Sequence, residues 1–380
     1  MTLRKENMLE RFRKKSAVQQ RETDCIYPGF VIKSYYSYML IKVPYGRLKN
    51  ISNLYGGCML QNIISGEYSS MLALCGILFA FLATVTATAK LCQYLPKDAG
   101  REFAHDGKLS AGKPRGAGII FVLAFVASAL FFVPMKAELA IYLILTVICM
   151  LTGFLDDASK KPWGEWKKGI LDLCVAILVA MTFLHYNDNT IELALFHHTQ
   201  LVIPRLVFGA LIVVLVWVSV NVTNCADGVD GLSGTLTIIT IMTIYLVDRI
   251  LGRGEDFSYL ILLFAACILG YLWYNATPSR LLMGDAGSRA MGLFISLAVL
   301  KTGSPVLYIP IALVLILDGG LGLIKVGLIR AFGIHIMTKI RTPLHDQVRK
   351  VWGWSNTQTV FRFAIIQIIL GVAVVYGIGL

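Results

Sequence analysis

The chain has 380 residues, of which 56% are hydrophobic and only 15% are charged. Soluble chains carry about 25% charged residues, so this composition excludes a large soluble globular protein and favours a chain that crosses a membrane several times. The net charge of +12 comes from Lys and Arg spread over many short loops, which is typical of polytopic membrane proteins and argues against a nucleic-acid partner.

The first 69 residues differ from the rest of the chain. They hold 11 Lys or Arg and 5 Asp or Glu, with tyrosines clustered at 35–38. The pattern assigns no role to this basic extension. We therefore divide the chain into an N-terminal extension, residues 1–69, and a membrane domain, residues 70–380.

Ten apolar segments in the second region approach the roughly 20 residues that a helix needs to cross a bilayer. We predict an all-α fold, a polytopic integral membrane protein with about ten transmembrane helices. Asp318, Gly319 and Gly320 should bend or break the ninth helix. The segments run over 71–94, 116–135, 138–155, 169–185, 204–224, 231–248, 258–275, 286–302, 305–330 and 359–380.

The distribution of basic residues predicts the orientation of these helices. The loops at 95–115, 156–168, 225–230, 276–285 and 331–358 lie on one side and together carry most of the loop Lys and Arg. The opposite loops carry only Lys136, Arg249 and Arg253. The positive-inside rule places the first set in the cytosol and both termini outside, although the basic extension would prefer the cytosolic side.

Two adjacent carboxylates, Asp156 and Asp157, end the third segment on the predicted cytosolic side. Neighbouring carboxylates repel each other, and a divalent cation relieves that repulsion. Lys160 follows four residues after Asp156, one helical turn further if the helix continues. The alternative is a solvated turn with a salt bridge at a helix end.

A second polar group closes the fifth segment and opens the sixth. Residues 221–232 read Asn-Val-Thr-Asn-Cys-Ala-Asp-Gly-Val-Asp-Gly-Leu and include Asn224, Asp227, Gly228 and Asp230. Helix capping and a glycine turn explain part of this pattern. They do not explain two Asn and two Asp at one membrane edge, so we expect a binding site beside the helix N-terminus.

Two further motifs fall on the same side. Asp285 stands in Met-Gly-Asp-Ala-Gly-Ser after a loop shaped by Asn275 and Pro278, and it could be a metal ligand or only a helix cap. His345 stands in Thr-Pro-Leu-His-Asp-Gln, where it could bind phosphate, shuttle a proton or only bond to a neighbour. Their shared side predicts one cytosolic cleft.

The first cytosolic loop is basic and rich in glycine. It carries Lys97, Arg101, Lys108, Lys113 and Arg115. Its spacing fits neither a Walker loop nor a dinucleotide fingerprint, so it is either a phosphate-binding loop of another kind or an ordinary positive-inside loop.

These motifs in this order resemble the polyprenyl-phosphate N-acetylhexosamine-1-phosphate transferases. The order is Asp-Asp-x-x-Lys, Asn-x-x-Asn-x-x-Asp-Gly-x-Asp-Gly-Leu, Met-Gly-Asp-x-Gly-Ser and Pro-Leu-His, over residues 71–380. The C-terminal Trp352-Gly353-Trp354 and Val360-Phe361-Arg362-Phe363 resemble the branch that makes lipid I for peptidoglycan.

The resemblance implies a reaction and its partners. It implies transfer of phospho-MurNAc-pentapeptide from a UDP-sugar nucleotide to undecaprenyl phosphate, with release of UMP. It further implies a ten-helix, often dimeric protein of the bacterial inner membrane, with a Mg²⁺-dependent active site that faces the cytosol.

The resemblance also implies roles for individual residues. Asp285 matches the metal ligand, with Asp156 and Asp157 as the catalytic acid pair that could share the metal. The substrate-binding and remaining catalytic positions match Lys160, Asn224, Asp227, Gly228, Asp230, Asn275 and His345.

Two departures bear on selectivity. Only His345 remains of three consecutive histidines, and Ser110 stands at the usual first-loop lysine, so Lys108 or Lys113 would replace that lysine. Two alternatives stay open: a sibling transferase that uses UDP-GlcNAc, and a membrane transporter built around Asp318 and Lys325 in the broken ninth helix.

Overall fold

The structure is a computed structural model that describes residues 69–100, 110–159, 161, 163–253 and 255–379. The chain divides into two units at Leu54, and all described residues belong to the second unit. The extension at 1–68 lies outside them, so the predicted boundary at residues 69 and 70 stays a prediction.

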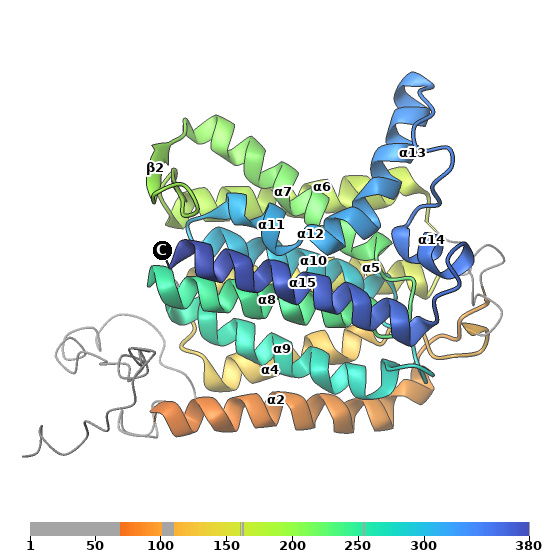
Figure 1. The fold of residues 1–380 in the computed structure, drawn as a ribbon. Coiled ribbons are helices and arrows are strands. Elements are labelled where there is room, and N and C mark those ends of the chain that lie inside the picture. Colours follow the sequence, from red (N-terminus) through yellow and green to blue (C-terminus); the bar gives the residue numbers. More distant parts are fainter. Residues whose placement is uncertain (1–68, 101–109, 160, 162, 254, 380) are drawn as a thin grey trace, which may run out of the picture. The chain divides into compact units, whose positions relative to one another are not determined.

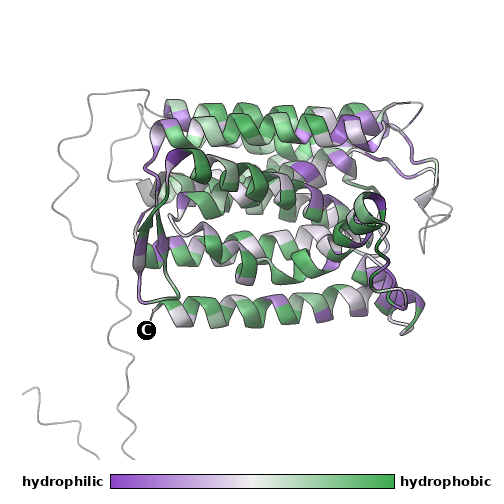
Figure 2. Cartoon of the chain, turned by 90° about the horizontal axis from the view of Figure 1, so that it is seen from above, coloured by the Kyte–Doolittle hydropathy of each residue, from purple (hydrophilic) through white to green (hydrophobic). Residues whose placement is uncertain are grey.

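The described chain is a bundle of helices that run side by side, with their polar loops gathered at the two ends (Figure 1). Figure 2 shows hydrophobic residues along the helices and hydrophilic ones mainly at the ends and in the loops, as a bilayer requires. The long helices are α2 (Ser69–Leu91), α4 (Gly118–Phe132), α5 (Ala137–Asp157), α6 (Glu165–Tyr186), α7 (Arg205–Cys225), α8 (Leu232–Leu251), α9 (Glu255–Asn275), α10 (Gly284–Lys301) and α15 (Asn356–Ile378).

All ten predicted segments contain helix, but they do not all qualify as lipid-facing spans. Seven of the described helices are long and apolar enough to cross a membrane, and a bent pair makes an eighth. The predicted number of ten is therefore the number of helical segments, of which eight at most meet the length and hydropathy criteria for a span. The two others are α4, with only 15 residues, and α10, which carries Asp285, Arg289 and Lys301 among its 18.

Helix α10 is the centre of the bundle. Every residue from Gly284 to Leu300 is buried, and the helix contacts α4, α5, α7 and α8. Because protein rather than lipid surrounds α10, it tolerates charges that a lipid-facing helix could not carry. Glycines allow this close packing. A Cβ on Gly118 of α4 would lie 2.0 Å from Gly287 N, and one on Gly153 of α5 would lie 2.4 Å from the Asp285 carbonyl carbon.

The ninth segment is broken, as predicted. It consists of η4 (Pro305–Leu307), α11 (Tyr308–Ile311), α12 (Leu313–Leu315), the π-helix η5 (Ile316–Gly320) and α13 (Leu321–Phe332). The part at Pro305–Ile311 and the part at Leu313–Phe332 meet at an angle of 69°, at a break that precedes the two glycines. Helix α13 then leaves the bundle (Figure 1). Gly319 lets this segment pack closely against α7, since a Cβ there would lie 2.1 Å from the carbonyl oxygen of Val222.

Three small elements complete the bundle. The hairpin of β1 (Thr190–Leu193) and β2 (Thr199–Val202) is antiparallel, with Thr190 opposite Val202, in a loop for which no strand was predicted. The 3₁₀ turn η3 (Cys92–Tyr94) follows α2. Helix α14 (Leu344–Lys350) lies in the last long loop and carries His345.

Candidate active site

The three predicted acids meet at one end of the bundle. Asp156 and Asp157 end α5, and Asp285 lies in the first turn of α10. Lys168, in the first turns of α6, joins two of them: its Nζ lies 3.0 Å from Asp285 Oδ2 and also contacts Asp156 Oδ2. The three helix ends therefore build one centre of alternating charge, called here the acid centre (Asp156, Asp157 and Asp285).

Arg115 joins the acids from the other side. Its Nε lies 2.8 Å from Asp157 Oδ1, and its two terminal nitrogens lie 3.6 Å from Asp285 Oδ1 and 3.3 Å from Asp98 Oδ1. Burial opposes the charge of this guanidinium, but the carboxylates of Asp157, Asp285 and Asp98 outweigh that cost and raise its pKa above the usual value. Arg115 is therefore a permanent cation in the centre.

Backbone pairing explains why Arg115 lies there. The residue forms a parallel bridge with Leu282, just before α10. Leu282 N donates to Pro114 O at 2.8 Å, and Ala117 N donates to Leu282 O at 3.0 Å. The first loop is thus attached to the strand-like segment that leads into Asp285, which fixes the guanidinium beside the acid centre.

The N-terminus of α10 stabilises the buried carboxylate of Asp157. Ala286 N donates to Asp157 Oδ2 at 3.3 Å, so a carboxylate from α5 lies where the helix dipole favours negative charge. Gly284 makes this approach possible. It adopts φ +68°, and a Cβ there would lie 2.0 Å from Asp157 Oδ2.

A cleft of about 460 Å³ opens beside the acid centre. Lys113 Nζ crosses part of it, 2.9 Å from Ser279 Oγ and 3.8 Å from Asp230 Oδ2. The cleft lies between the first loop, the polar turn at 227–230 and the loop that leads into α10. Its lining includes the predicted residues Lys113, Asp227, Gly228, Asp230 and Asn275, together with Arg115 and Asp98.

Asn275 and Asp230 shape the rim of this cleft. Asn275 Oδ1 accepts from Gly231 N at 2.8 Å, and its Nδ2 donates to Leu281 O at 2.9 Å. Asp230 Oδ2 accepts from Ser279 N at 3.1 Å. These bonds tie the turn before α8 to the loop before α10.

Asn224 lies in the last turn of α7, outside the cleft lining. Its Nδ2 donates to Ser288 Oγ at 3.2 Å, and Ser288 lies less than one turn beyond Asp285. Asn224 therefore links the polar turn at 224–230 to the helix that carries Asp285.

His345, from the last loop, lies behind the cleft lining, against Gly228. It is buried, its Nδ1 lies 2.9 Å from Asp318 Oδ2, and its backbone N donates to Asp318 Oδ1 at 2.7 Å. A carboxylate at Nδ1 favours the tautomer with its proton there, which leaves Nε2 as an acceptor. Gly228 packs against that edge, since a Cβ there would lie 2.1 Å from Nε2.

Sequence reasoning and structure differ most on the cations. Lys160 and Lys108 lie outside the described residues, so their predicted roles stay predictions. The sequence pattern does not distinguish Lys168 from other loop lysines, and it gives Arg115 only as one member of a basic loop. The sequence feature that could have indicated Lys168 is its position at the start of a predicted helix, on the same side of the membrane as the acids.

The acid centre offers ligands that suit Mg²⁺, namely carboxylate oxygens. Among the described residues no three His, Cys, Asp or Glu form a ready-made metal cage. Mg²⁺ is commonly held by one or two carboxylates together with substrate phosphates, so this arrangement still fits it. Asp157 Oδ1 is also buried without an aligned hydrogen bond, despite its closeness to Arg115 Nε.

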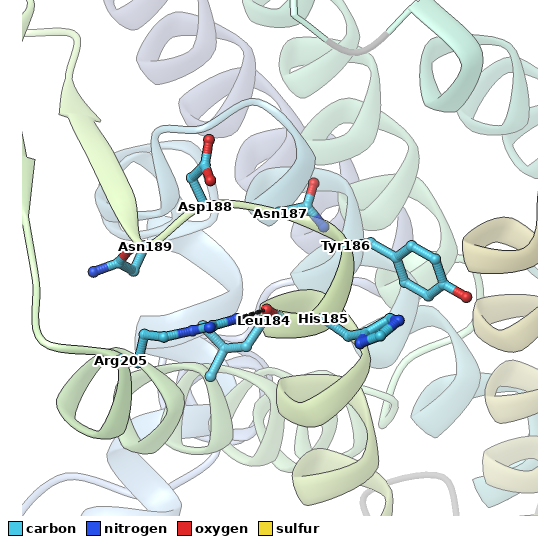
Figure 3. A pocket seen from close by; sticks show the side chains of 7 residues that line it. All are labelled: Leu184, His185, Tyr186, Asn187, Asp188, Asn189 and Arg205. Carbon is cyan, nitrogen blue, oxygen red and sulfur yellow. Dashed lines mark hydrogen bonds between the residues drawn. The ribbon is translucent and has the colours of Figure 1, made fainter.

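A second cavity, of about 210 Å³, lies at the opposite end of α6. Figure 3 shows its polar lining, with Arg205 donating to the carbonyl oxygen of Leu184. The 22 residues of α6 span about 33 Å, so this cavity is remote from the acid centre. None of the predicted site residues lines it.

Comparison with known proteins shows the family of the chain. Residues 139–303 match the family model described as glycosyl transferase family 4. The phospho-N-acetylmuramoyl-pentapeptide-transferase of Treponema pallidum is 38% identical over 304 residues, which cover 76% of this chain and 84% of that protein. Proteins of the same name from Nitratiruptor sp. and Bartonella quintana are 26% and 27% identical, over 80% and 77% of this chain and 93% and 87% of their own lengths. This chain belongs to the phospho-N-acetylmuramoyl-pentapeptide-transferase family.

Proposed function

We propose that this protein transfers phospho-MurNAc-pentapeptide from its UDP carrier to undecaprenyl phosphate, which gives lipid I and UMP. Its site would face the cytosol of a bacterial inner membrane, and the protein would act as a homodimer. The observation that carries the proposal is the meeting of Asp156, Asp157 and Asp285 with Lys168 and Arg115 beside a cleft, at one end of a membrane bundle.

The chemistry needs two phosphate-bearing substrates to approach each other. Arg115, Lys168 and Lys113 supply the positive charge that lowers their repulsion. Mg²⁺, held by Asp285 with Asp156 or Asp157, would supply further charge neutralisation for the pyrophosphate and the leaving UMP. Each cation already contacts a carboxylate, so substrate phosphates would compete with those carboxylates for the cations, and the added negative charge would need Mg²⁺ to balance it.

In the proposed reaction the lipid phosphate is its own nucleophile. The second pKa of a phosphate monoester is near 6, so the dianion predominates at neutral pH and no strong base is needed. One of its oxygens attacks the sugar-linked phosphorus, and the bond from that phosphorus to the bridging oxygen breaks. UMP leaves with the electron pair. Asp156 and Asp157 would position the attacking phosphate.

A two-step route through a phosphorylated Asp156 or Asp157 is the competing mechanism. It predicts that a covalent adduct forms on one of these residues when the UDP donor is added without the lipid acceptor. Mass spectrometry of the protein after brief exposure to the donor distinguishes the routes. An adduct formed at a rate comparable to turnover would refute direct attack.

The choice of donor is tested with the purified protein in lipid nanodiscs. Undecaprenyl phosphate and Mg²⁺ are combined with UDP-MurNAc-pentapeptide or with UDP-GlcNAc, and the lipid product and UMP are measured. We expect lipid I and UMP from the first donor only. UMP from UDP-GlcNAc alone would identify the sibling transferase instead.

A transporter is the less favoured alternative. The charged groups of the broken segment have local partners: Asp318 contacts His345, and Lys325 Nζ donates to the carbonyl oxygens of Met337 and Ile340 at 3.1 and 2.9 Å. If neither donor yields UMP, the transporter alternative would be favoured instead.

A further inference from the structure

A buried ion pair lies one helical turn deeper in the bundle than the acid centre. Asp172 of α6 and Arg289 of α10 expose only 3% and 2% of their side chains. Arg289 Nε donates to Asp172 Oδ1 at 3.1 Å, and Nη2 contacts the same oxygen. Neither residue belongs to a sequence motif described above, and neither lines the cleft.

This pair is in register with the contact between Lys168 and Asp285. Lys168 and Asp172 are four residues apart on α6, and Asp285 and Arg289 are four apart on α10, so each pair shares a helix face. The two helices therefore carry two parallel ion pairs of opposite polarity. A slip of one residue, about 1.5 Å along the axis, would disturb both contacts at once.

Stability alone does not account for this pair. A buried ion pair usually stabilises a fold no better than apolar side chains of the same volume, because both charges lose their hydration. Arg289 is also imperfectly satisfied, since its Nη1 has no hydrogen-bond partner in the described part of the chain. Ionisable side chains at such depth in a membrane bundle are costly and point to function.

We propose that Asp172 and Arg289 are positioning residues that fix the register of α6 relative to α10, since α6 packs mainly on α5 and α7 and reaches α10 through these long side chains. They thereby hold Lys168 Nζ between Asp156 and Asp285 during phosphoryl transfer. Asn221 of α7 supports the arrangement, since its Nδ2 lies 3.5 Å from Asp172 Oδ2. This inference rests on the proposed function and acts through Lys168, with no contact of its own to substrate.

The test replaces the pair by apolar side chains in the double variant Asp172→Leu/Arg289→Met. Thermal unfolding, kcat for UMP release and KM for the UDP donor are measured in nanodiscs. We expect an unfolding temperature equal to that of the unmutated protein or higher. We expect kcat to fall about tenfold to a hundredfold, as errors of about 1 Å in catalytic geometry do, with KM changed less than about twofold.

Two single variants keep the test decisive if the double variant does not fold. Arg289→Lys keeps a charge near Asp172 but loses the two-nitrogen contact, so we expect a smaller loss of kcat. Asp172→Asn keeps the shape and removes the charge, so we expect a larger loss. A kcat within twofold of the unmutated value in both variants would overturn the proposal.

A matched control uses another ion pair of α10. Lys301 Nζ lies 3.0 Å from Glu138 Oε1, and this pair joins the far end of α10 to α5. The variant Glu138→Leu/Lys301→Met should keep kcat. An equal loss of kcat in the control, or an unchanged kcat in the Asp172 and Arg289 double variant, contradicts a positioning role. An unmutated protein that releases no UMP refutes the proposed function itself.

Discussion

At the scale of the single residue, Arg115 is the cation that this chain places among the acids. Removal of a charged hydrogen-bonding group commonly costs about 1.5–3 kcal/mol, which corresponds to roughly tenfold to a hundredfold. We predict that Arg115→Ala lowers kcat/KM for UMP release by at least about tenfold and that Arg115→Lys restores part of it. Exposed Arg280, in the loop before α10, is the control. Equal kcat/KM for Arg115→Ala and Arg280→Ala would contradict the role.

Gly228 limits the space around His345. A Cβ at residue 228 would overlap His345 Nε2, so Gly228→Ala must displace the imidazole or the turn. We predict a lower unfolding temperature, from a loss of about 1–3 kcal/mol typical of overpacking, together with a loss of UMP release. Gly327→Ala is the control, because nothing lies within 4 Å of its Cβ. A fully active Gly228→Ala would show that His345 is not required in this position.

Residue patterns predicted most of the acids but not their partners. Asp156, Asp157, Asp285, Asp227 and Asp230 stand out because acids beside glycines are unusual in an apolar chain. Their cations do not stand out, because Lys and Arg are expected in every cytosolic loop. Two cations, Arg115 and Lys168, lie among the acids only because of the tertiary structure. The bridge to Leu282 places Arg115 there, and the start of α6 places Lys168.

At the scale of the element, glycines set how closely α4 and α5 approach α10. Gly153→Ala would place a Cβ against the Asp285 backbone, which cannot move as a flexible side chain can. We predict a lower unfolding temperature and reduced kcat, because α5 carries Asp156 and Asp157. Gly169→Ala, which meets nothing within 4 Å, should leave the unfolding temperature unchanged or raise it. Equal effects of the two substitutions would refute this account of packing.

Hydropathy predicted where the helices lie but not which of them lipid surrounds. α10 was among the shortest predicted segments, yet it is the most enclosed helix, because small residues and charges suit a protein environment. The bend of the ninth segment was predicted from its glycines and charges, but it occurs near Ala312, before them. The hairpin β1–β2 has only four residues in each strand, too few for a clear alternating pattern.

At the scale of the whole molecule, the proposal requires the acid centre to face the cytosol. Trp166, near the start of α6, is 87% exposed, and Phe196, beyond its other end, is 63% exposed. In a variant whose eight native cysteines are replaced, we predict that Trp166→Cys reacts with an impermeant maleimide only after the cells are opened. Phe196→Cys should react in intact spheroplasts. The reverse pattern would invert the orientation derived from loop charges.

The central claim is that the acid centre, with Mg²⁺, releases UMP from the UDP donor. The most direct measurement is UMP release by the unmutated protein and by Asp285→Asn, with undecaprenyl phosphate and UDP-MurNAc-pentapeptide, across a Mg²⁺ titration. Asp285→Asn keeps the shape of the side chain but removes the charge that faces Lys168 and Arg115. We predict UMP release that requires Mg²⁺ and is lost in the variant. Equal release by both proteins, or release without Mg²⁺, would contradict the account.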